Sequence, residues 1–80
     1  MRVIFRHLLV SGMVATSDAG VLVLIDSEQP ESEQLVALWH EALHLIGLRD
    51  EDQVEAFAQR LAQACPEILA AAKSAAERRT

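Results

Sequence analysis

The segment from Leu38 to Gly47 contains the pattern His-Glu-x-x-His in otherwise uncharged sequence, and it constrains the chain more than any other feature. Residues four apart on a helix lie on the same face, so a helix would direct the imidazoles of His40 and His44 at one ion. Glu41 lies one step round the helix, where it suits contact with a water on that ion better than direct binding. The segment is therefore predicted to be a helix that carries a metal site.

The arrangement of apolar, polar and turn-forming residues outside this segment predicts an α+β fold, with a small β-hairpin or meander at the N-terminus packed on three helices. Residues 2–10 are rich in β-forming types and are predicted to form one strand, with His7 and Leu9 on its apolar face. Residues 16–20 are a cluster of turn formers. The continuous apolar run at 21–25 is typical of a strand that is covered on both faces.

The three helices are predicted at residues 30–46, 51–64 and 67–77. Pro30 suits a first helical turn, Gly47 suits a C-cap, and Asp50 suits the N-cap of the second helix. Pro66 ends that helix and can start the next. With 80 residues and no long linker, the chain is predicted to be a single minimal metallopeptidase-like domain, residues 1–80.

Charge and composition limit the classes of partner that the chain is expected to bind. The formal net charge of −5 argues against nucleic acid and against an anionic membrane surface. A single cysteine, Cys65, permits no intrachain disulfide and fits a cytoplasmic location. Arg6 and His7 interrupt the first apolar run, so no signal peptide is expected. Trp39 and the exposed side of the hairpin are the surface expected to pair if the chain forms a homodimer.

A third metal ligand has to come from outside the motif, and the candidates are Asp50, Glu51 and Glu55. Glu51 falls near the core-facing edge of its helix, and this position favours it as the third ligand. Asp50 is expected to be occupied as an N-cap. Glu55 is expected to be a solvated helix residue, the alternative being an acceptor for a histidine N–H. His7 carries no spacing signal and is expected to be an ordinary strand residue.

Two zinc peptidase patterns resemble the sequence. His-Glu-x-x-His-x-x-Gly-x-x-Asp is similar to the extended motif of metzincin-like proteases and would make Asp50 a ligand, but no methionine follows it. The run Val21–Ile25, the motif itself and Glu51-x-x-Val54-x-x-Phe57-Ala58-x-x-Leu61 together resemble the ImmA/IrrE-type minimal gluzincin metallopeptidases. That resemblance covers roughly residues 21–61 and implies that Glu51 is the third ligand and that a regulatory protein is the target.

The expected function is a zinc-dependent metallopeptidase that acts on a peptide or protein substrate. Zn²⁺ would lower the pKa of a bound water, and Glu41 would act as general base and then protonate the leaving amine. Arg49 and His7 are candidates for a second oxyanion donor. The alternatives are a non-catalytic zinc-stabilised protein-binding module, which the short chain favours, and a metal-free interaction domain.

Overall fold

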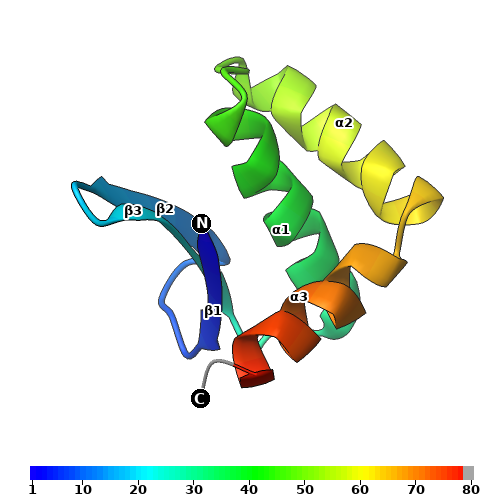
Figure 1. Cartoon of the computed structure of the whole chain (residues 1–80). Helices are drawn as coiled ribbons and strands as arrows, with labels where there is room; N and C mark the ends of the chain where they lie inside the picture. The colour runs from blue at the N-terminus through cyan, green and yellow to red at the C-terminus, as the bar shows by residue number, and fades with distance from the viewer. Residues whose placement is uncertain (79–80) are drawn as a thin grey trace.

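The computed structural model describes residues 1–78 and shows a three-stranded sheet followed by three helices, which confirms the α+β prediction (Figure 1). The elements in chain order are β1 (Arg2–Arg6), β2 (Gly12–Ser17), β3 (Gly20–Asp26), α1 (Glu31–Leu45), α2 (Glu51–Ala64) and α3 (Glu67–Arg78). All three helices lie on one side of the sheet (Figure 1). Of the described residues, no helix is long and apolar enough to cross a membrane.

The strand order is β1-β3-β2, so the last strand in sequence occupies the centre of the sheet. β2 and β3 form an antiparallel hairpin, whereas β1 pairs with β3 in parallel, with Arg6 opposite Asp26. The prediction of one strand over residues 2–10 was wrong in its length. β3 ends at Asp26, so the chain must leave the sheet after Arg6 and cross the end of β3 to reach β2, which leaves Leu9 99% exposed.

The two faces of β3 differ because its side chains alternate in direction. Val23 and Ile25 point to the helices and are 2% and 0% exposed. Leu22 and Leu24 lie on the opposite face and are only half-buried. The prediction that this strand is covered on both faces was therefore wrong: the helices cover one face, and the outer face of the hairpin retains apolar side chains.

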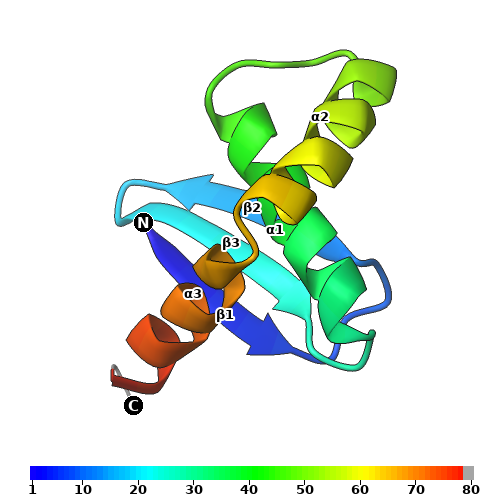
Figure 2. The ribbon, with the colours of Figure 1, turned by 90° about the vertical axis from the view of Figure 1, so that its right-hand side faces the viewer.

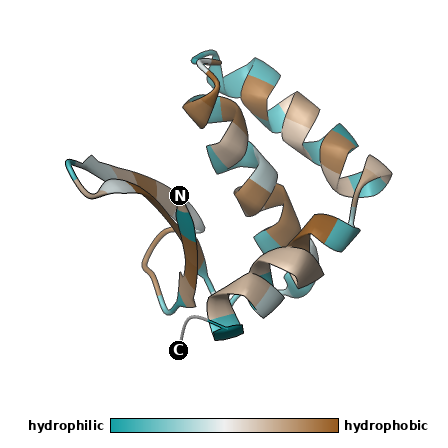
Figure 3. Cartoon of the chain, in the orientation of Figure 1, coloured by the Kyte–Doolittle hydropathy of each residue, from teal (hydrophilic) through white to brown (hydrophobic). Residues whose placement is uncertain are grey.

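Two hydrophobic clusters hold the layers together. The larger lies between the sheet, α1 and α3, and its buried members are Val23, Ile25, Leu35, Ala37, Leu38 and Leu69. The smaller joins α1 to α2 through Leu43, Val54 and Ala58. Trp39 packs against both clusters. Hydrophobic residues accordingly run along the sheet and along much of α1 (Figure 3).

The helices differ in how they are attached. Among the described residues, α2 packs against α1 alone, whereas α3 packs against both α1 and β1 (Figure 2). At the start of α1, Gln34 is 4% exposed and its Nε2 donates to the carbonyl oxygen of Gln29 at 2.9 Å. This bond ties the helix to the loop that follows β3. The position of α2, and of any residue on it, thus depends on its contact with α1.

Candidate metal centre

His40 and His44 lie one turn apart on α1 and point in the same direction, as their spacing predicts. Their Nε2 atoms are 3.2 Å apart, and the ring centroids are 4.9 Å apart. The side chains are 20% and 28% exposed, because the rings lie at the border between the α1–α2 contact and solvent. Both rings therefore present the same nitrogen to one point at the surface of the helix pair.

Glu51, in the first turn of α2, reaches that point from the other helix. Its Oε1 is 2.9 Å from His44 Nε2, and its Oε2 is 3.2 Å from His40 Nε2. One donor atom from each of the three residues lies within 4.8 Å of the other two. The two helices thus bring together the three residues that the sequence singled out, and their role as ligands stays a prediction.

The turn after α1 fixes the orientation of His44. Gly47 has a φ of +104°, a conformation that glycine adopts readily, and it closes the helix with two backbone bonds. Gly47 N–H donates to the carbonyl of His44 at 3.1 Å, and Leu48 N–H donates to that of Leu43 at 3.1 Å. The turn places the Leu48 carbonyl oxygen 2.9 Å from His44 Nδ1. Because a carbonyl can only accept, Nδ1 must carry the proton.

Glu55 has the equivalent function for His40. Its Oε2 lies 3.1 Å from His40 Nδ1, and its Oε1 accepts a bond from Gln59 Nε2 at 3.0 Å. Glu55 is an exposed helix residue, as expected, and it also makes the contact that the alternative described, as an acceptor for a histidine N–H. Partners of this type fix the tautomer of a metal-binding histidine and make its free nitrogen a better donor of electrons.

These contacts occupy the Nδ1 atom of each ring and leave Nε2 at the centre of the cluster. A ring that carries its single proton on Nδ1 turns the lone pair of Nε2 toward the carboxylate of Glu51. The contacts of 2.9–3.2 Å join four atoms, the two Nε2 atoms and the two carboxylate oxygens of Glu51, and a cation among them, either a metal ion or a proton on a ring, would offset their repulsion. Two imidazoles and a carboxylate are a ligand set of catalytic zinc sites.

Glu41 lies beside this cluster in a cavity of about 530 Å³. The cavity is bounded by α1, α2 and the start of β2, and its lining includes His40, Glu41, Glu55, Gln59, Ser11 and Gly12. Burial raises the pKa of the Glu41 carboxyl, and the nearby charge of Glu51 raises it further, against the lowering effect of His40 and His44. The carboxyl is thus disposed to hold a proton beside the cluster.

Gly12 allows β2 to approach Glu41 closely, a feature that sequence reasoning missed. A Cβ at Gly12 would lie 3.4 Å from Cγ of Glu41 and 3.3 Å from the carbonyl oxygen of Leu24. A glycine inside a strand often marks such an approach, and this was the available signal. The contribution of the Leu48 carbonyl was also missed, because a backbone atom has no residue type that could indicate it.

The remaining candidates lie apart from the cluster. Asp50 is the N-cap of α2, as predicted: its Oδ1 accepts from Asp52 N–H at 3.0 Å and from Gln53 N–H at 3.2 Å. His7 is an exposed loop residue 3.9 Å from Asp26 Oδ1. Neither His7 nor Arg49 lines the cavity of Glu41.

No protein-family model matches the chain, and no curated protein or solved structure is significantly similar to it. The resemblance to ImmA/IrrE-type peptidases therefore stays a prediction from the residues quoted above.

Proposed function

We propose that the chain is a zinc-dependent metallopeptidase in which His40, His44 and Glu51 hold the metal and Glu41 moves the proton. The observation that carries this proposal is the convergence of three donor atoms within 4.8 Å, beside a carboxylate that shares a cavity with His40. When bound, zinc would lower the pKa of a water ligand and polarise the carbonyl of the scissile bond.

The residues of the chain supply positioning and proton transfer. Leu48 and Glu55 hold the two rings with Nε2 toward the centre, so the ligand atoms need little reorganisation to bind. Glu41 accepts a proton from the attacking water and passes it to the leaving amine. Its raised pKa suits this task, because a carboxyl that holds a proton more readily is a better base at neutral pH.

A second candidate, a zinc-stabilised binding module, is favoured by the attachment of α2. Two of the three ligand residues lie on α1 and the third on α2, and α2 packs against α1 alone among the described residues. A metal held there would fasten α2 to the rest of the domain even without catalysis. In this alternative the protein is a zinc-binding adaptor, and Glu41 has no chemical role.

Replacement of Glu41 by glutamine distinguishes the peptidase from the zinc-binding adaptor. The Glu41→Gln protein should bind zinc as the parent does and should fail to cleave a proteome-derived peptide library, with new termini detected by mass spectrometry. Glu67→Gln is the matched control, since it removes an exposed carboxylate from the first turn of α3. Equal cleavage by the parent and Glu41→Gln would refute the peptidase. Zinc uptake with no cleavage by either protein would favour the adaptor.

A further inference from the structure

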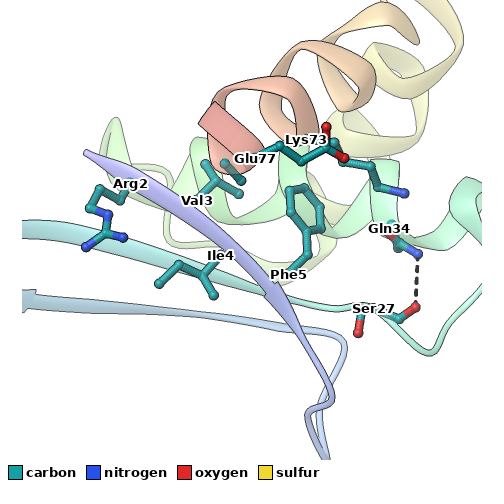
Figure 4. A pocket seen from close by; sticks show the side chains of 9 residues that line it. Arg2, Val3, Ile4, Phe5, Ser27, Gln34, Lys73 and Glu77 are labelled. Atoms are coloured by element: carbon teal, nitrogen blue, oxygen red, sulfur yellow. Dashed lines mark hydrogen bonds between the residues drawn. The ribbon is translucent and has the colours of Figure 1, made fainter. Parts of the chain in front are cut away.

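A second cavity lies along β1, at the edge of the sheet opposite to β2. It measures about 460 Å³ and touches the four consecutive residues 2–5 on one side, with Lys73 and Glu77 of α3 on the other (Figure 4). Consecutive residues of a strand point to opposite faces of the sheet. A cavity that contacts all four therefore runs along the edge of the strand, where the backbone groups lie.

The outer backbone groups of β1 face this cavity. Among residues 1–78, β1 pairs with β3 alone. The carbonyl of Arg6 accepts from Ser27 N–H at 2.9 Å, so the backbone of Arg6 faces β3. Because this direction alternates along a strand, the N–H and C=O groups of Val3 and Phe5 face outward. An edge with such groups is a template for a further strand.

α3 forms a roof over this edge. In Figure 2, α3 crosses β1 and continues beyond the free edge of the sheet. The side chains of Val3 and Phe5 point toward α3 (Figure 4), and Lys73 Nζ lies 5.6 Å from the centroid of the Phe5 ring. A strand placed beside β1 would therefore have half of its side chains under α3, where apolar residues fit. Its other side chains would lie beside Arg2, Ile4 and Arg6.

The charges at this edge indicate the partner. Arg2 and Arg6 are exposed and lie on the same face of β1, with Ile4 between them. On α3, Lys73 adds a positive charge and Glu77 a negative one to the lining of the cavity, and Asp26 of β3 lies opposite Arg6, so the exposed arginines of β1 carry the charge argument. Cross-strand pairs of opposite charge stabilise a sheet. We propose that β1 binds an extended acidic segment of a partner protein as a fourth strand, with the pattern acidic-apolar-apolar-apolar-acidic. The pattern is symmetrical, so it fits either strand direction.

A second copy of this chain fits the edge less well. Two β1 strands paired antiparallel about Ile4 would place Arg2 of each opposite Arg6 of the other, and like charges directly opposite are destabilising. This register disfavours a second copy, and the proposed partner is a different protein. This proposal does not depend on the metal centre, because the residues that carry it belong to β1 and α3.

The test uses the full chain and a fluorescent peptide with the core Glu-Val-Val-Val-Glu, capped at both ends, with binding followed by anisotropy. The double variant Arg2→Glu, Arg6→Glu should bind it on the order of tenfold more weakly, since two attractive cross-strand pairs become repulsive. A peptide with lysine at both glutamate positions should show the reverse preference. Recovery of binding in this swapped pair shows that the variant is folded.

Two further measurements address the backbone. N-methylation of the three valines should abolish binding. Val3→Pro should do the same, since it removes an outward N–H while the bonds to β3 remain. Equal binding of the acidic and basic peptides to the parent, or full binding of the N-methylated peptide, would overturn the proposal. So would a dimer in sedimentation that Val3→Pro dissociates, because the edge would then belong to a second copy.

Discussion

The contact between Glu55 and His40 gives the sharpest test of the metal centre. Loss of a residue that orients a metal-binding histidine costs about 10- to 100-fold in metal affinity. The Oε2–Nδ1 distance of 3.1 Å is that of a good hydrogen bond, but the Glu55 side chain is 51% exposed, so water can replace part of its effect. We therefore expect Glu55→Ala to weaken zinc binding about tenfold, or about 1.4 kcal/mol.

Competition with a chromophoric zinc chelator at neutral pH measures this change. Asp52→Ala is the matched control, because Asp52 is an exposed carboxylate of the same helix whose side chain contacts neither histidine. Its loss should change the affinity by less than about twofold, the effect of a screened surface charge. Glu55→Gln keeps an oxygen acceptor, so its zinc affinity should fall between those of Glu55→Ala and Asp52→Ala. If Glu55→Ala and Asp52→Ala weaken binding equally, Glu55 acts only through its charge, and the orientation of His40 does not depend on it.

Three other changes test separate parts of the structure. In the metal-free protein, Glu41→Gln should raise the melting temperature at neutral pH. Burial raises the pKa of Glu41, so ionisation of this carboxyl opposes folding. The gain in melting temperature should vanish as the pH falls below the ordinary carboxyl range, because Glu41 of the parent is then also neutral. Gly12→Ala should lower the rate of peptide cleavage more than the zinc affinity, because the added Cβ would lie 3.4 Å from Glu41 Cγ and its other nearest atoms belong to Leu24 and Ile25; equal losses of both would contradict this. Leu69→Ala should lower the free energy of unfolding, measured in urea, by about 2–5 kcal/mol, because Leu69 is a buried member of the larger cluster. A decrease below about 1 kcal/mol would mean that α3 contributes little to that core.

The helices could be predicted closely because their signals are local. The expected ranges of 30–46, 51–64 and 67–77 differ by a residue or so from α1, α2 and α3. Asp50 caps α2 through bonds to residues two and three positions away, so its role is readable from the sequence. The turn at Gly47 is equally local.

The sheet could be predicted only in part because its pairing is not local. No pattern within residues 2–6 shows that they pair in parallel with a strand some 20 positions later, so the strand order was missed. In the site, the spacing of His40 and His44 follows from helix geometry alone. The contacts of Glu51 and Glu55 with them depend on the angle and register of two packed helices, and sequence could name these residues only as candidates.

The central position of β3 has a consequence for the order in which the chain folds. The β2–β3 hairpin and the α1–α2 pair each join neighbouring segments, so their loop-closure entropy is small and they are expected to form early. β1 precedes β3 in the sequence but must wait for β3 to pair with it, and α3, which covers β1, follows both. β1 and α3 therefore join the sheet and the helix pair late, and removal of α3 should release β1 from its cover before it disturbs the helix pair that carries the histidines.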